Sequence, residues 1–118
     1  MTLSLGMITV DTQDAESLGG WWAQQLGGKV LETNDGWFVR ISIGEGRPFL
    51  AFQKVDDPTP GKNRLHLDLT TDDRVGEVAR LTAAGATVVA EEQMPGFAWT
   101  VLADPDGNQF CVAQHDGS

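Results

Sequence analysis

The sequence is poor in several features that mark particular classes of protein. A single cysteine, Cys111, cannot form an intramolecular disulfide, so nothing in the 118 residues indicates an oxidising compartment. No apolar run approaches the roughly 18 residues of a membrane span, and no charged-then-apolar leader opens the chain. We therefore expect a cytoplasmic protein with no membrane partner.

Basic residues are also scarce. Eight lysines and arginines stand against 17 acidic residues, which gives a formal net charge of −9. A nucleic-acid partner requires a basic surface to contact phosphates, so this balance argues against one. A negative cleft attracts positive charge, so the same balance favours a cationic or neutral small-molecule ligand. Solubility alone also explains the acidity, and both interpretations stay open.

Tyrosine is absent, whereas four tryptophans and five phenylalanines are present. The chain therefore has large apolar side chains but no phenolic hydroxyl for acid–base chemistry. It also lacks the Gly-x-Gly-x-x-Gly, P-loop and Gly-x-Ser-x-Gly motifs. The sequence thus gives no sign of the usual dinucleotide, phosphate-binding or nucleophile-elbow sites.

A pattern of strand, helix and three strands occurs twice along the chain. Asp14 is expected to cap the first helix and Gly27-Gly28 to end it, while Asp73 caps the second. The expected strands are 3–11, 29–33, 37–43, 48–55, 64–71, 87–92, 97–103 and 108–114, with a hairpin at "NDG" and an apolar helix stripe of Val75, Val78, Ala79 and Leu81. A Pro- and Gly-rich linker, 57–62, is predicted to join module one, 1–56, to module two, 63–118, within one domain.

The opening strands of the two modules share one alternation. Ile8 and Val10 are expected to face the core, with Met7 on the other side; His66 and Asp68 take the corresponding non-core side in module two. Residue identity between the halves is low, so this repeat is one of pattern. A four-stranded sheet with one helix leaves one face bare. Two such units bury that face by curving into a shared cup or by pairing with another chain.

This tandem arrangement resembles the vicinal oxygen chelate superfamily, which includes glyoxalase I, bleomycin-resistance proteins, fosfomycin-resistance enzymes and extradiol dioxygenases. The segments "DAESLGGWWAQQLGGKV", "KNRLHLDLTTDDRVGEVARLTAAGATVV" and "WTVLADPDGNQFCV" are similar to the first helix, the second module and the terminal hairpin of its glyoxalase-like group. The resemblance implies an α+β fold in which two tandem β-α-β-β-β modules form a curved mixed-sheet cup. It implies no single chemistry, because this fold hosts many.

In metal-dependent members of the superfamily, four His, Gln or Glu side chains hold a divalent cation. The resemblance places those positions at Met7, at Ala51 or Gln53, at His66 and at Cys111. A hard cation needs oxygen and imidazole donors, and only His66, with Gln53 as a weak ligand, supplies them. We therefore expect no metal cofactor, with His66 the ligand if any divalent metal binds. A soft copper(I) site of Met, His and Cys is an alternative.

Three residues of module two each have more than one interpretation. His66 fits a hydrogen-bonded residue inside the cup, or a ligand contact or general base. Asp68 shares its face and fits a surface carboxylate, an orienting partner of His66 or a contact for a cationic ligand. Cys111 fits a small buried hydrophobic residue or a nucleophile.

Aromatic residues complete the predicted site. Bleomycin-resistance-like proteins hold flat cationic antibiotics between aromatic side chains in acidic clefts, and ordinary strand packing explains the same residue types. The predicted ligand-binding set is Met7, Trp37, Phe38, Phe52, Gln53, Trp99 and Cys111, with His66 and Asp68 as candidate catalytic residues.

Three functions are consistent with this set. The first is a metal-independent small-molecule binding protein, a homodimer with its cups at the subunit interface. The second is a lyase, isomerase or dioxygenase with an altered metal site. The third is a metal-free enzyme that uses His66 and Asp68 as an acid–base pair.

Overall fold

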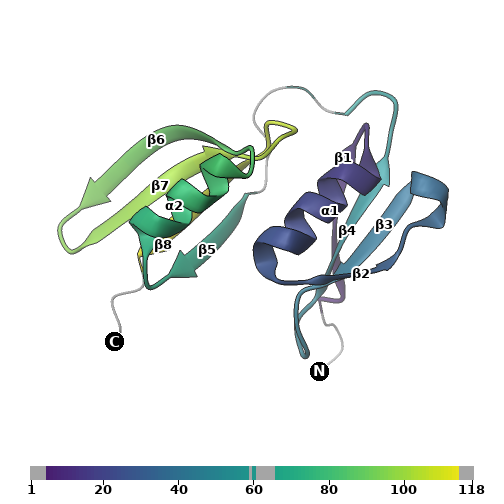
Figure 1. Cartoon of the computed structure of the whole chain (residues 1–118), viewed down its shortest axis with the longest axis horizontal. Helices are drawn as coiled ribbons and strands as arrows, with labels where there is room; N and C mark the ends of the chain where they lie inside the picture. Colours follow the sequence, from purple (N-terminus) through teal and green to yellow (C-terminus); the bar gives the residue numbers. More distant parts are fainter. Residues whose placement is uncertain (1–4, 59, 61–65, 115–118) are drawn as a thin grey trace. The chain divides into compact units, whose positions relative to one another are not determined.

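The computed structural model describes residues 5–58, 60 and 66–114, and it divides into two compact units, Met1–Thr59 and Pro60–Ser118 (Figure 1). This division falls inside the predicted linker, of which residues 59, 61 and 62 lie outside the described residues. The first unit contains β1 (Met7–Thr12), α1 (Ala15–Leu26), β2 (Lys29–Glu32), the 3-10 turn η1 (Asn34–Gly36), β3 (Phe38–Ser42) and β4 (Phe49–Lys54). The second contains β5 (Leu67–Thr71), α2 (Arg74–Ala83), β6 (Thr87–Met94), β7 (Phe97–Ala103) and β8 (Gln109–Gln114).

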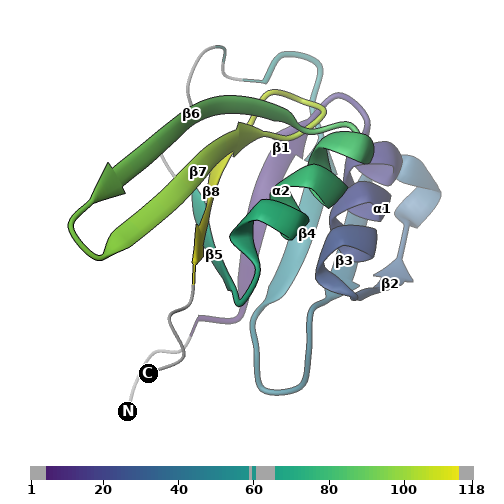
Figure 2. The same ribbon diagram turned by 60° about the vertical axis from the view of Figure 1, so that its left-hand side comes forward.

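Each unit is a mixed four-stranded sheet with one helix. The strand orders are β1-β4-β3-β2 and β5-β8-β7-β6, so the two sheets have the same topology. The β1–β4 and β5–β8 pairs are parallel, and the other pairs are antiparallel. Each helix packs on one face of its own sheet (Figures 1 and 2). The predicted α+β fold with two tandem modules is therefore confirmed, although residues 3–4 and 64–65 of the predicted first strands lie outside the described residues.

The core of module one lies between α1 and the inner strands. Asp14 caps the helix by accepting a hydrogen bond from the Ser17 N–H at 3.1 Å, and Gly27 ends it in the left-handed conformation at φ 65°. Gly19 lets the helix approach the sheet closely, since a Cβ there would lie 2.8 Å from Val39 Cγ1. The buried residues of this layer are Leu18, Trp22, Ala23, Val39, Ile41, Leu50 and Phe52.

The "NDG" stretch forms the predicted hairpin between β2 and β3. Asn34 and Asp35 both have positive φ, at 46° and 56°, followed by Gly36 at 88°. Asparagine, aspartate and glycine tolerate this left-handed backbone better than other residues, which is why these three occupy the turn. The Asn34 Nδ2 also donates to the Phe38 carbonyl at 2.9 Å.

Module two is built in the same way but has a different helix face. Asp73 caps α2 by accepting from the Gly76 N–H at 3.1 Å, and Leu81 is buried. The predicted apolar stripe is wrong in part, because Val75 is 72% exposed and Ala79 is also exposed. Residues 74, 78 and 81 also lie on one face of a helix, because they are spaced by four and three positions. Arg74 is the first residue of that face.

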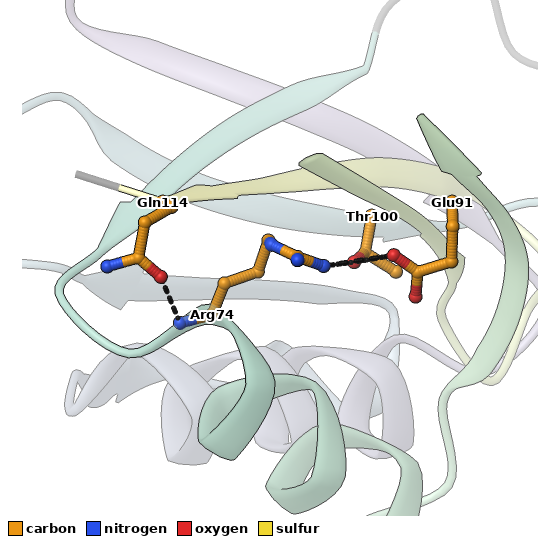
Figure 3. A network of polar contacts seen from close by, with 4 residues as sticks. All are labelled: Arg74, Glu91, Thr100 and Gln114. Atoms are coloured by element: carbon orange, nitrogen blue, oxygen red, sulfur yellow. Dashed lines mark hydrogen bonds and ion pairs between the residues drawn. The ribbon is translucent and has the colours of Figure 1, made fainter. Parts of the chain in front are cut away.

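Arg74 connects α2 to three strands of its sheet (Figure 3). Its Nη1 donates to Thr100 Oγ1 at 2.8 Å and to Glu91 Oε2 at 2.9 Å, and its backbone N–H donates to Gln114 Oε1 at 2.9 Å. The Thr100 hydroxyl, which is fully buried, donates in turn to Glu91 Oε2 at 2.9 Å. The network gives the start of α2 a defined position on β6, β7 and β8.

The turn before β8 is held by one buried carboxylate. Asp104 is 4% exposed, and its Oδ1 accepts from the backbone N–H groups of Asp106 and Asn108, both at 2.9 Å. Gly107 follows at φ 89°. This turn sets the register of β8 against β7, in which Cys111 lies opposite Val101.

None of the helices among the described residues is long and apolar enough to cross a membrane.

Candidate functional site

Strand alternation divides each sheet into a helix-covered face and a face that its own helix does not cover, which we call the helix-free face. In module two the helix-covered face carries Leu69, Leu102 and Phe110, and the alternating residues Asp68 and Cys111 lie on the helix-free face. Among the side chains that the structure describes on β5, β7 and β8, those on the helix-free face are Asp68, Thr70, Trp99, Val101, Ala103, Gln109, Cys111 and Ala113.

His66, Asp68 and Cys111 form a cluster on this face. Asp68 and Cys111 are directly opposite each other in the parallel β5–β8 pair. His66 Nδ1 lies 3.3 Å from Asp68 Oδ1, and one donor atom from each of the three residues lies within 4.8 Å of the others. The His66 and Asp68 side chains are 43% and 72% exposed, and Cys111 is half-buried. The structure thus brings together both predicted catalytic residues and one predicted ligand-binding residue.

Trp99 lies beside this cluster. It is opposite Ala113 on β8, and Ala113 follows Cys111 by two residues on the same face. Diagonal neighbours on one sheet face are about 7–8 Å apart, within reach of an indole ring. Glu92 pairs with Trp99 from β6 and is exposed. Module two therefore presents a half-buried aromatic ring with the Glu92 carboxylate and the Cys111 thiol on the neighbouring strands, and with Asp68 and His66 one strand beyond Cys111.

Module one presents a different set on its helix-free face. Phe38 and Gln53 are opposite each other in the β3–β4 pair, and both are half-buried. Met7 pairs with Phe49 and is 42% exposed. These positions place three of the predicted ligand-binding residues, Met7, Phe38 and Gln53, on one face.

Arg40 and Phe49 belong to the same face and were not predicted from the sequence. The Arg40 guanidinium lies 4.6 Å from the Phe49 ring centroid, and its Nε pairs with Glu32 Oε1 at 2.7 Å. A cation over an aromatic face is attracted by the ring quadrupole. The signal that could have identified both residues is their alternation parity with Phe38 and Gln53.

Two predicted aromatic contacts lie elsewhere in module one. Phe52 is 1% exposed on the helix-covered face, where a Cβ at Gly19 would lie 3.2 Å from its ring, so it is a core residue and its predicted place in the ligand-binding set needs correction. Trp37 precedes β3 at the end of the η1 turn and is 58% exposed. Its carbonyl accepts from the Lys54 N–H at 2.9 Å, which positions its backbone at the end of the sheet.

The two sheet registers distinguish Ala51 from Gln53 as the counterpart of Cys111. Thr9 pairs with Ala51 in β1–β4, and Asp68 pairs with Cys111 in β5–β8. Because Thr9 follows Met7 by two residues as Asp68 follows His66, Ala51 is the counterpart of Cys111. Ala51 is fully buried and carries no donor atom.

The residues at the family's ligand positions do not fit a hard divalent cation. Module one supplies a thioether at Met7 and a methyl group at Ala51, and module two supplies the imidazole of His66 and the sulfur of Cys111. Magnesium and manganese require oxygen-rich, near-octahedral sites, which this set does not provide. We derive no chemistry through such a metal.

Comparisons with known proteins agree with this fold. The model of the glyoxalase-like domain family matches residues 7–113. No significantly similar sequence was found among the curated proteins.

Three solved structures illustrate the similarity. A glyoxalase/bleomycin resistance protein/dioxygenase family enzyme from Burkholderia phytofirmans PsJN has a TM-score of 0.80 at 20% identity, covering 95% of this chain and 98% of that chain. A superfamily member from Sphaerobacter thermophilus DSM 20745 has 0.72 at 25% identity, covering 96% and 98%. TnmS3, an antibiotic binding protein from Streptomyces sp. CB03234, has 0.71 at 23% identity, covering 97% and 98%. With the family model matched over nearly all of its length, the chain belongs to the glyoxalase-like domain family, within the vicinal oxygen chelate superfamily.

Proposed function

We propose that this protein binds a small organic molecule, cationic or aromatic, without the hard divalent cation used by metal-dependent members of its superfamily. The observation that carries the proposal is the residue set at the family's ligand positions. Met7 and Ala51 offer no donor that a hard cation prefers. Only His66, with Gln53 as a weak ligand, supplies a donor of the kind that such a cation prefers, and this incomplete set supports binding without that metal.

The residues beside those positions support a cationic or aromatic ligand. Trp99 is half-buried and shares the helix-free face of module two with two carboxylates: Glu92 is its direct partner on β6, and Asp68 lies two strands away on β5. An aromatic ring flanked by carboxylates attracts a flat organic cation through stacking and charge. The formal net charge of −9 adds a long-range attraction of the same sign.

One structural relative is consistent with this proposal. TnmS3 is described as an antibiotic binding protein, and its fold covers 97% of this chain. At 23% identity the likeness carries the fold, and it makes a natural-product ligand a reasonable first class to test.

A metal-free acid–base enzyme is the second candidate. The 3.3 Å separation of His66 Nδ1 and Asp68 Oδ1 favours it, because a carboxylate beside one ring nitrogen orients an imidazole for proton transfer at the other. A lyase, isomerase or dioxygenase with an altered metal site is the remaining alternative, and metal-dependent turnover would distinguish it.

Native mass spectrometry in a metal-chelating buffer tests the proposal. The wild-type chain is expected to retain members of a library of cationic aromatic natural products and to retain fewer of their neutral, non-aromatic counterparts. Trp99→Ala and Asp68→Asn are each expected to weaken binding at least about tenfold, equivalent to about 1.4 kcal/mol. Asp57→Asn removes the same charge from an exposed linker position and is the matched control.

Two outcomes would contradict the proposal. One is that no library member is retained. The other is that retention appears only when a hard divalent cation is supplied. Conversion of a retained compound by wild type, with His66→Ala binding it unchanged, would favour the acid–base enzyme.

A further inference from the structure

We infer that Arg40, on the helix-free face of module one, binds the carboxylate of an aromatic acid. The inference goes beyond the proposed function, whose main contacts lie in module two, and does not depend on it. It rests on two contacts that hold the guanidinium in place and on the hydrogen-bond donors that those contacts leave unused. Arg40 is not one of the positions that the family resemblance assigns to a metal.

Two neighbours fix the orientation of the Arg40 guanidinium. Its Nε donates to Glu32 Oε1 at 2.7 Å, and Glu32 is its direct partner on the edge strand β2. Its Cζ lies 4.6 Å from the centroid of the Phe49 ring, and the side chain is 33% exposed. A group that is ordered before the ligand arrives loses less conformational entropy on binding, so this arrangement favours recognition.

The terminal nitrogens of Arg40 are the donors that remain for a ligand. A guanidinium carries several N–H donors in one plane, and the bond to Glu32 uses the one on Nε. Among the residues that the structure describes, Glu32 is the only acceptor for this guanidinium. Two terminal nitrogens side by side match the two oxygens of a carboxylate, which they bind through parallel hydrogen bonds.

The charges on this face favour a singly charged group. By strand register, its described side chains include two cations, Arg40 and Lys29, and two carboxylates, Glu32 and Asp11. A doubly charged phosphate needs more positive charge than this balance supplies. The net charge of −9 repels anions at long range, so an anion that is retained must be held by local contacts.

Phe38 gives the site its preference for an aromatic ring. It precedes Arg40 by two residues on β3, so both side chains lie on the same face, and it is half-buried. The residue directly opposite Arg40 is Ala51, whose side chain is a single methyl group. A ring that carries the carboxylate therefore contacts Phe38 while its oxygens bind Arg40.

Benzoate, acetate and benzamide test the inference on the intact, ¹⁵N-labelled chain. Acetate keeps the charge without the ring, and benzamide keeps the ring without the charge. Two-dimensional NMR titration is expected to show saturable binding of benzoate at millimolar concentration or below, with the largest amide shifts in β3 and β4. Acetate and benzamide are each expected to bind at least about tenfold more weakly.

Two substitutions of Arg40 separate its charge from its planar donors. Arg40→Lys keeps the charge but loses the paired nitrogens, so benzoate affinity is expected to fall at least about fivefold. Arg40→Gln should lower it further, and circular dichroism checks that both variants are folded. Arg47→Gln is the matched control, because it removes the same charge from an exposed residue of module one, and it should leave the affinity unchanged.

Three outcomes would overturn the inference. The first is that wild type shows no saturable binding of benzoate. The second is that acetate or benzamide binds as tightly as benzoate, and the third is that benzoate affinity is unchanged in Arg40→Lys and Arg40→Gln. Benzoate carries no positive charge, and the cationic library is read separately by mass spectrometry, so failure of this inference is distinguishable from failure of the proposed function.

Discussion

Gly19 and Gly20 are neighbours in α1 with opposite surroundings. A Cβ at Gly19 would lie 2.8 Å from Val39 Cγ1 and 3.2 Å from the Phe52 ring, while a Cβ at Gly20 would meet nothing within 4 Å. We expect Gly19→Ala to lower the free energy of unfolding by about 1–3 kcal/mol through overpacking. Gly20→Ala should raise it by about 0.5–1 kcal/mol, because alanine favours a helix interior.

Urea unfolding of the two variants measures both effects. Equal changes of the same sign would contradict the close approach of helix and sheet at Gly19. The pair needs no further control, since both substitutions add one methyl group to the same helix.

At the residue scale the candidate site was predictable where strands alternate clearly and not where they are apolar throughout. "LDLT" alternates, so the face of Asp68 was predicted correctly. "FLAFQ" has apolar residues at four consecutive positions, so its pattern does not show which face of the strand is covered by the helix. The helix α1, which buries Phe52, makes that distinction.

Among the elements, α2 depends on polar contacts more than α1 does. Arg74 Nη1 donates to the buried Thr100 hydroxyl and to Glu91, and its side chain is 21% exposed. We expect Arg74→Ala to lower the free energy of unfolding by about 1–3 kcal/mol, because these partners lose a charged donor. Thermal and urea unfolding with circular dichroism provide the measurement.

Arg80→Ala is the control on the same helix. Arg80 pairs with Glu77 at an exposed surface, so its loss should cost less than about 1 kcal/mol. If the two variants are equally stable, Arg74 is not an anchor of α2.

The face of α2 was mispredicted for a physical reason. Val75 and Ala79 are apolar, but they are small and offer little area to bury, whereas the Arg74 side chain is long enough to reach Thr100 and Glu91 on the sheet. Caps, strand order and turns were more predictable, because they depend on local residues such as Asp14, Asp73 and "NDG".

For the whole molecule, we predict that the protein is a homodimer, because pairing with a second copy can bury the sheet face that each module's own helix leaves bare. Each copy carries a formal net charge of −9, so two copies repel each other over distances comparable to the Debye length. Sedimentation at micromolar concentration is expected to show a dimer that is stabilised by raised ionic strength. A monomer at all salt concentrations would contradict the prediction.

The tandem repeat made the overall fold predictable, since two matching patterns reinforce each other. What the repeat did not predict is the difference between its halves. Equivalent positions hold Met7, Thr9 and Ala51 in one module and His66, Asp68 and Cys111 in the other. Pattern alone cannot assign chemistry to one half, because the backbone registers are the same.

That shared register is also a template for protein engineering. Three substitutions would place the side chains of module two at the equivalent backbone positions of module one: Met7→His, Thr9→Asp and Ala51→Cys. The parent chain would then serve as the negative control, because its module one lacks those three side chains. Because the two modules share one backbone register, the side chains of module two can be transferred to the equivalent positions of module one.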